Sequence, residues 1–276
     1  MSRVRGCSDV HDRLSLICFL PLFFLCYYLL PARFRNAFLL VGSHGFCLLA
    51  ILPGLLAVDV AGEFLTNYSA SERESFYFKT DFHWNPRGAF AASADLAAAM
   101  QENGLLDGVV LPAAEDFAWQ DLDCPYRGDL NRRFSYLFSM QEEIPYYSIR
   151  ETSELQYYDA KDVEVPRESI WARGLQSGEE MQYNLLSTEN LGFYRICNPN
   201  ARSARRVLIL KDSMEDPMTD YWAELFSEII VIDPRSYLRE ESLPELVAEY
   251  DIDMALFLYH QNNLSEELID FLNRGE

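Results

Sequence analysis

The C-terminal third of the chain alternates short apolar segments with helical ones, and this pattern most constrains the fold. Residues 206–211, 228–232 and 253–258 have the composition of buried strands. Helices are predicted after these strands, over residues 217–227, 242–250 and 264–274. Strands that alternate with helices of this length form a parallel sheet with right-handed crossovers. The sequence therefore predicts an α/β fold, a parallel sheet with flanking helices; short further strands are predicted over 146–150, 155–158 and 162–165.

Polar residues follow each of the three strands. Ser213 follows the first, Asp233 and Arg235 follow the second, and residues 259–263, which begin with Tyr259, follow the third. Ligands bind at the carboxyl edge of such a sheet, so these residues mark a candidate site. Polar residues are also common simply because the chain leaves the core at a strand end. Both interpretations stay open at this point.

A second candidate site is the loop over residues 79–86, which contains Asp81, His83 and Trp84. A short strand over 76–79 is predicted to lead into it. Asn85 is a good N-cap and Pro86 suits the first helical position. A helix is therefore predicted over 87–101, stopped by the glycine at position 104.

Ser213, His83 and Asp81 together have the residue types of a nucleophilic triad. A serine hydroxyl needs a base within hydrogen-bond reach, and an acid beside a histidine orients it and stabilises its imidazolium form. With four histidines in the chain, His260 is the alternative base. Trp84 is a candidate for stacking on a sugar, with a buried packing role favoured. This chemistry calls for no metal and no cofactor.

The N-terminal region contains two apolar segments, residues 14–30 and 37–58, separated by Arg33 and Arg35. Each is long enough to cross a bilayer. We expect a membrane anchor over residues 1–60 with one or two transmembrane helices, a linker over 61–75, and a soluble domain over 76–276 on the extracytoplasmic side. Buried core helices are the alternative. The net charge of −20 leaves no basic face for nucleic acid, which we exclude as a partner.

Parts of the N-terminal region resemble the start of the membrane-bound O-acyltransferase family. The similar segments are residues 19–24, 27–31 and 33–36. The many further spans of such an enzyme do not follow. The resemblance suggests that a membrane-bound O-acyltransferase supplies the acetyl donor.

Residues 77–85, with Gly88 and Ala89, resemble the signature of the family named for an Asp-His-His-Trp motif (DHHW). That family is related to the extracytoplasmic alginate O-acetyltransferases, which have an SGNH-hydrolase-like fold. Residues 207–213, 231–235 and 250–253 resemble its later blocks, so the resemblance extends from about residue 75 to the C-terminus. It implies Ser213 as nucleophile, His83 as base and Asp81 as the orienting acid, with Arg235 and Tyr259 as substrate or oxyanion contacts.

Two departures from the family pattern affect the expected structure and function. Phe82 stands where the motif has its first histidine, and the long segment that usually precedes the motif is short here. We therefore expect an incomplete sheet. The predicted function is membrane-anchored O-acetylation of an extracytoplasmic polysaccharide through an acyl-enzyme. The alternatives are an SGNH-type carbohydrate esterase, and a truncated non-catalytic relic or binding module.

Overall fold

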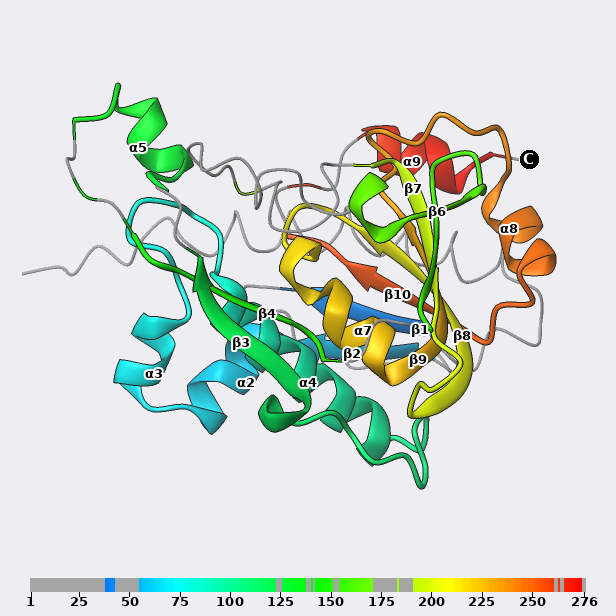
Figure 1. The fold of residues 1–276 in the computed structure, drawn as a ribbon, viewed down its shortest axis with the longest axis horizontal. Coiled ribbons are helices and arrows are strands. Elements are labelled where there is room, and N and C mark those ends of the chain that lie inside the picture. The colour runs from blue at the N-terminus through cyan, green and yellow to red at the C-terminus, as the bar shows by residue number, and fades with distance from the viewer. Residues whose placement is uncertain are drawn as a thin grey trace, which may run out of the picture.

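The computed structural model describes residues 38–42 and 55–274, apart from 123–125, 138–139, 141, 151–153, 171–182, 184–190, 261–262 and 264–265 (Figure 1). The described strands are β1 (Phe38–Gly42), β2 (Leu55–Asp59), β3 (Phe117–Leu122), β4 (Ile144–Ile149), β5 (Gln156–Tyr158), β6 (Glu164–Val165), β7 (Phe193–Cys197), β8 (Ser203–Lys211), β9 (Phe226–Ile232) and β10 (Met254–Leu258). The described α-helices are α2 (Val60–Asn67), α3 (Ala70–Ser75), α4 (Pro86–Glu102), α5 (Asp129–Arg133), α7 (Thr219–Leu225), α8 (Leu243–Glu249) and α9 (Glu266–Leu272).

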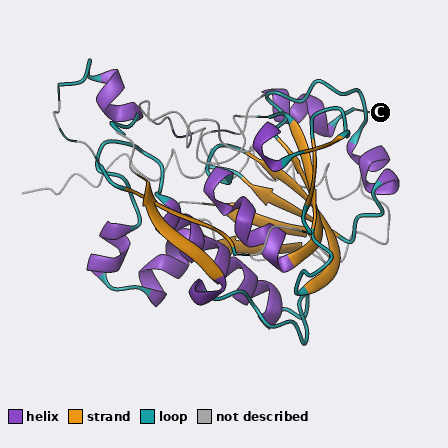
Figure 2. Ribbon diagram, in the orientation of Figure 1, coloured by secondary structure: helices purple, strands orange, loops and turns teal. Residues whose placement is uncertain are grey.

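The described residues form one large sheet and one small one (Figure 2). The large sheet has eight described strands in the order β2-β1-β10-β8-β9-β7-β5-β6. The strands from β2 to β9 in this order are all parallel, whereas β7, β5 and β6 are joined by antiparallel pairs. The predicted α/β fold is therefore confirmed, with an antiparallel edge added to its parallel part.

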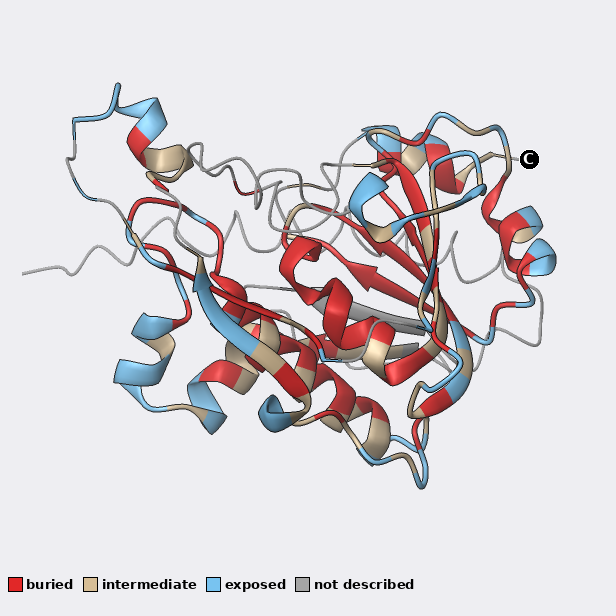
Figure 3. Ribbon diagram, viewed as in Figure 1, coloured by how far each residue is buried: buried red, intermediate tan, exposed pale blue. Residues whose placement is uncertain are grey.

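Helices cover both faces of the large sheet, and the strand β8 shows how the sequence directs this. Alternate side chains of a strand point to opposite faces. Val207 and Ile209 belong to one buried cluster with residues of α4 and α7, whereas Leu208 and Leu210 belong to another with residues of α8 and α9. Figure 3 shows β10 and nearly all of α7 as buried. All four side chains are fully buried, which explains the unbroken apolar run in the sequence.

The second N-terminal apolar segment, residues 37–58, contains β1 and β2. The expectation of a transmembrane helix there is wrong for the described part of this segment, because β1 pairs in parallel with both β10 and β2. A strand buried in a parallel sheet is apolar throughout, so apolar composition does not distinguish it from a membrane span. None of the described helices is both long enough and apolar enough to span a bilayer. The first apolar segment, 14–30, lies outside the described residues.

The parallel part of the sheet extends further than the sequence indicated, and the expected incomplete sheet stays a prediction. β1 and β2 come before the 79–86 loop in the chain and extend the parallel part of the sheet beyond β10. Residues 61–75, expected to form a linker, lie in α2 and α3 with the turn between them. The short segment before the motif therefore still supplies two strands and two helices.

The 79–86 loop leads directly into α4. The predicted strand over 76–79 is reduced to one isolated bridge between Tyr77 and Trp84. The Asn85 side chain accepts hydrogen bonds from the N–H groups of Arg87 and Gly88, at 2.9 and 3.2 Å. The predicted N-cap is thus confirmed, and it fixes where the loop ends and the helix begins.

The other elements lie close to their predicted positions. The helix predicted over 217–227 is shorter, because a 3-10 turn occupies Asp216–Met218 and β9 already begins at Phe226. α8 and α9 lie inside the ranges predicted for them, and β4, β5 and β6 overlap the three short strands. β4 pairs with β3 in the small sheet and not with β5.

Replacing the cap residue tests how much this helix start stabilises the protein. We expect Asn85→Ala to lower the free energy of unfolding by about 1 kcal/mol, because two N–H groups of the first turn lose their acceptor. Urea unfolding followed by circular dichroism measures this. Asn103→Ala at the other end of α4 is the control, since among the described residues its exposed side chain bonds the Ala99 carbonyl alone, and it should change stability by less than about 0.5 kcal/mol. Equal losses in both variants would contradict the capping role.

Candidate active site

Three side chains from two distant segments form a continuous hydrogen-bonded chain. His83 Nε2 lies 2.9 Å from the hydroxyl oxygen of Ser213, which is 130 residues further along the chain. His83 Nδ1 lies 2.6 Å from Asp81 Oδ1. Ser213 follows β8 at the carboxyl edge of the sheet, and the other two residues come from the loop before α4. The sequence-predicted nucleophile, base and acid are therefore in hydrogen-bond contact in the order that the chemistry needs.

The carboxylate of Asp81 is buried and accepts several hydrogen bonds. Oδ1 also accepts from the backbone N–H of His83, while Oδ2 accepts from the Tyr126 hydroxyl at 2.6 Å and from the N–H of Asp129 at 2.7 Å. Burial by itself raises the pKa of Asp81, but the hydrogen bonds from His83, Tyr126 and Asp129 outweigh it and bring this pKa to about 2. The acid is therefore ionised at neutral pH, as the stabiliser of an imidazolium must be.

Close backbone packing holds the Asp81 loop against the segment that carries Tyr126 and Asp129. Gly128 has a φ of +64°, and a Cβ atom there would lie 2.1 Å from the carbonyl oxygen of Thr80. Only glycine permits this approach. The carboxylate of Glu142 accepts hydrogen bonds from the N–H groups of Lys79 and Thr80, at 2.5 and 2.7 Å. The loop is thus fixed at the two residues that immediately precede the acid.

Two aromatic rings stack on the imidazole of His83. The Tyr183 ring is nearly parallel to it, with centroids 3.7 Å apart and planes at 13°. The Phe82 ring lies 4.0 Å away, with the planes at 31°. Two rings this close cannot share one face of an imidazole without overlapping each other, so they lie on opposite faces. The imidazole is therefore confined between two rings, with its nitrogens directed at Asp81 and Ser213.

The turn that carries Ser213 is organised by Asp212. Its carboxylate accepts hydrogen bonds from the N–H groups of Met214 and His260, at 2.9 and 2.6 Å, and from the side-chain amide of Asn263 at 2.8 Å. This joins the turn after β8 to the loop after β10. His260, the alternative base, takes part in this contact through its backbone, while the serine hydroxyl is bonded by His83. The geometry thus favours His83 as the base.

The same turn leaves one backbone donor for an oxyanion. The N–H groups of Asp212, Met214, Glu215 and Asp216 all donate hydrogen bonds to other groups of the described chain. The N–H of Ser213 has no such bond there. A backbone N–H beside the attacked carbonyl is a usual oxyanion donor, so we assign this N–H as the candidate.

Arg235 and Tyr259, the predicted substrate or oxyanion contacts, are bonded or buried away from the triad. The guanidinium of Arg235 forms two hydrogen bonds with the Asp233 carboxylate, at 2.9 and 2.6 Å. Tyr259 is buried, and its hydroxyl has no hydrogen-bond partner among the described residues. Burial raises the pKa of this hydroxyl well above its usual range. The described part of the chain thus shows no hydrogen bond from either side chain to the triad.

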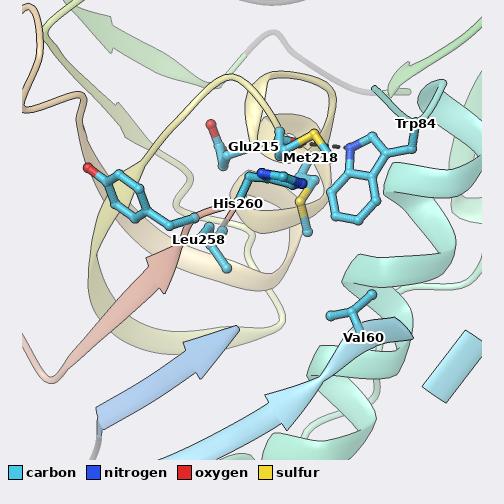
Figure 4. Close-up of a pocket in the computed structure, with 8 residues that line it drawn as sticks. Val60, Trp84, Glu215, Met218, Leu258 and His260 are labelled. Atoms are coloured by element: carbon cyan, nitrogen blue, oxygen red, sulfur yellow. Dashed lines mark hydrogen bonds between the residues drawn. The ribbon is translucent and has the colours of Figure 1, made fainter. Parts of the chain in front are cut away.

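Trp84 packs beneath the nucleophile turn. Its side chain is 5% exposed, and Nε1 donates a 2.8 Å hydrogen bond to the carbonyl oxygen of Met214. Figure 4 shows the indole at one side of a small apolar cavity that Met218, Leu258 and His260 also line. An indole this buried does not offer a face to a sugar. The packing role is therefore the one that the structure supports, and it ties the two triad segments together.

Buried charges underlie the nucleophile turn. Lys211 forms an ion pair with Asp216, and both side chains are inaccessible to solvent. Glu215, also fully buried, accepts a hydrogen bond from Thr219 at 3.1 Å. Burial raises the pKa of Glu215 to about 8, although Lys211 lowers it in part, so this carboxyl is protonated at neutral pH. The described turn therefore carries one buried ion pair with a neutral acid beside it.

Sequence reasoning missed three residues around the triad: Tyr126, Gly128 and Tyr183. None is part of a motif that signals contact with a histidine or an acid. Gly128 gave the only usable signal of the three, because a glycine in an irregular segment can mark a close approach of two backbones. The two tyrosines were not distinguishable from the other tyrosines of the chain.

The comparisons with known proteins agree with this fold. Residues 53–164 match the family model described as "SGNH hydrolase-like domain, acetyltransferase AlgX". The structure is similar to Bacillus cereus PatB1 with a sulfonyl adduct, with a TM-score of 0.72 and 20% identity over 94% of this chain and 91% of that chain. It is also similar to a DHHW family protein from Eubacterium siraeum, with a TM-score of 0.64 and 16% identity over 87% and 84% of the two chains. A comparison with curated proteins found no match. The resemblance to DHHW and alginate O-acetyltransferase-like SGNH proteins is thus confirmed, and the solved structures show a shared fold.

Removing the Tyr126 hydroxyl tests the hydrogen bonds of Asp81. The folded-state pKa of about 2 lies below the unfolded value of ~3.9. Asp81 therefore stabilises the fold above pH ~4, and this contribution is lost as the pH falls through about 2. Tyr126→Phe should raise the folded-state pKa and cost about 1.5–3 kcal/mol of stability at pH 7.

The stability difference between wild type and Tyr126→Phe should therefore shrink as the pH is lowered from 7 to 2, measured by urea unfolding at each pH. Tyr136→Phe is the control, because Tyr136 is an exposed tyrosine of the neighbouring turn. A difference that stays constant over this pH range would contradict the assignment.

Proposed function

We propose that this protein is an O-acetyltransferase that transfers an acetyl group to a hydroxyl of a polysaccharide outside the cytoplasm, through an acetyl ester on Ser213. The observation that carries the proposal is the 2.9 Å contact between His83 Nε2 and Ser213 Oγ, with Asp81 bonded to the other ring nitrogen. The match to an acetyltransferase family model supports the reaction class. PatB1 with a sulfonyl adduct shares the fold and supports it as an analogy.

In the first half-reaction, Ser213 attacks the carbonyl carbon of the acetyl donor while His83 Nε2 takes the hydroxyl proton. The imidazolium that forms is stabilised by ionised Asp81. The negative charge on the carbonyl oxygen is received by the N–H of Ser213. When the tetrahedral intermediate collapses, the bond to the donor's leaving group breaks, and His83 returns the proton to that group. The products are the acetylated serine and the protonated leaving group.

In the second half-reaction, a polysaccharide hydroxyl takes the place of the leaving group. His83 Nε2 removes its proton, and its oxygen attacks the acetyl carbonyl carbon. Collapse breaks the bond to Ser213, and the imidazolium returns its proton to the serine oxygen. A new ester forms and the enzyme is regenerated, with no metal or cofactor in either step.

Two alternative functions remain. An esterase differs from the transferase in its acceptor, and a non-catalytic protein differs from both because it forms no acetyl-enzyme. If water is the acceptor, the same residues make a carbohydrate esterase. The non-catalytic relic was motivated by an expected incomplete sheet, and the parallel pairing of β1 with β2 and β10 weakens that motive. The acetyl donor is proposed to come from a membrane-bound O-acyltransferase.

The extracytoplasmic location is part of the proposal, because the proposed acceptor is an extracellular polysaccharide. The apolar segment 14–30 is proposed as the anchor, and it lies outside the described residues. Protease accessibility of the C-terminal domain in intact cells measures the location. Digestion only after lysis would contradict it.

Acylation can be tested directly with an activated ester. Wild-type protein mixed with 4-nitrophenyl acetate should release one equivalent of nitrophenol in a burst and gain one acetyl group on the peptide that contains Ser213, detected by mass spectrometry. Ser213→Ala should abolish both signals. His83→Ala should slow the burst by about 10²- to 10⁴-fold, because the general base is lost.

His260→Ala is the matched control, since the serine hydroxyl is bonded by His83. It should retain the burst within a few-fold. Loss of labelling in His260→Ala with normal labelling in His83→Ala would contradict the assigned roles. The absence of any burst from folded wild-type protein would favour the non-catalytic reading.

A further inference from the structure

Phe82 combines exposure with direct contact to the proposed base. Its side chain is 44% exposed, although its ring lies 4.0 Å from the imidazole of His83. The opposite face of the imidazole is covered by Tyr183, which is buried. Among the described residues, Phe82 is thus the aromatic ring on His83 that a ligand can reach. Its position also departs from the family motif, which has a histidine there.

A guanidinium is held over the same ring. The Arg133 guanidinium carbon lies 5.5 Å from the Phe82 ring centroid, and Arg133 Nε donates a 2.7 Å hydrogen bond to Asp129 Oδ2. The backbone N–H of Asp129 in turn bonds the carboxylate of Asp81. The position of Arg133 is therefore coupled to the triad through one residue.

Arg132, Arg133 and Asp129 form a small patch whose charge is opposite in sign to that of the whole chain. Arg132 also bonds the carboxylate of Asp129, so two exposed guanidinium groups share one carboxylate. Arg132, Arg133 and Asp129 together thus carry one net positive formal charge, on a protein whose formal net charge is −20. Such a local excess favours contact with hydroxyl or anionic groups of a ligand.

The second half-reaction requires an acceptor hydroxyl beside His83, close to the Phe82 ring. Once Ser213 carries the acyl group, the acceptor hydroxyl must lie within ~3 Å of His83 Nε2 to lose its proton. A saccharide ring positioned in this way lies within a few ångströms of the exposed ring that stacks on the imidazole. The apolar C–H face of a sugar ring packs well against an aromatic ring, which also excludes water from the contact.

We propose that Phe82 and Arg133 form the acceptor subsite, in which a saccharide ring packs on Phe82 and Arg133 donates hydrogen bonds to its oxygen atoms. This inference rests on the proposed function and names the residues that favour transfer over hydrolysis. Because the subsite holds the acceptor and not the donor, its loss affects the second half-reaction more than the first.

The test separates the two half-reactions in Phe82→Ala. Acylation is measured by the 4-nitrophenyl acetate burst without acceptor. Transfer is measured as acetylated product and free acetate, with cellohexaose as a neutral acceptor and oligogalacturonate as an anionic one. We expect an acceptor KM raised by about three- to tenfold and a larger share of free acetate, with a smaller fall in the burst because the Phe82 ring also contacts His83. Phe82→Trp should restore the KM.

Tyr77→Ala is the matched control, because Tyr77 is similarly exposed at 42% and lies just before the 79–86 loop. It should leave both half-reactions unchanged. Arg133→Gln should raise the KM as well, more for oligogalacturonate than for cellohexaose, because it removes a charge.

Four outcomes overturn the inference. An unchanged KM and unchanged product ratio in Phe82→Ala would show that the ring does not hold the acceptor. Loss of the burst in this variant would show that Phe82 serves only to orient His83. Equal effects in Tyr77→Ala would show a general disturbance of the loop. A wild-type burst with no transfer to either acceptor would leave hydrolysis as the activity. Failure of the proposed function itself is distinguishable, since it removes the burst from wild-type protein.

Discussion

The hydrogen bond between His83 and Ser213 depends on how firmly the loop before α4 is held against the edge of the sheet. Several tethers of this loop come from distant parts of the chain. Glu142 binds two of its N–H groups, and Trp84 reaches under the nucleophile turn to the Met214 carbonyl. Gly128 allows the backbone that carries Asp129 to approach closely enough to bond Asp81. The position of the His83 imidazole therefore depends on the contacts that other segments make with this loop.

The surroundings of the triad divide into a buried side and an open side. Tyr126 and Tyr183 are buried and contact the acid and the imidazole, so they fix charge and orientation. Phe82 contacts the same imidazole from solvent. An acyl-transfer site needs both properties, because the base must be held rigidly and must still meet a large acceptor. The two faces of one imidazole provide them separately.

The N-terminal strands show where apolar composition misleads. β1 and β2 belong to a segment that satisfies the length and composition of a membrane span, and the described part of it forms parallel strands. Strands of a parallel sheet are apolar on both faces, so they carry no polar alternation that would distinguish them from a membrane span. β8 has the same character, but the helices predicted after it and after the next two strands made its assignment clear. The elements that flank an apolar segment therefore help to distinguish a buried strand from a membrane span, whereas its composition does not.

Local physics determined much of this protein from sequence alone. The strands and helices after residue 203, the cap at Asn85, and the identities of Asp81, His83 and Ser213 all follow from patterns within a few residues. The tertiary structure decided the rest: β1 and β2 as strands of the sheet, and Tyr126 and Tyr183 at the triad. These depend on segments that meet only after folding, and no short-range pattern specifies which of many tyrosines will pack there.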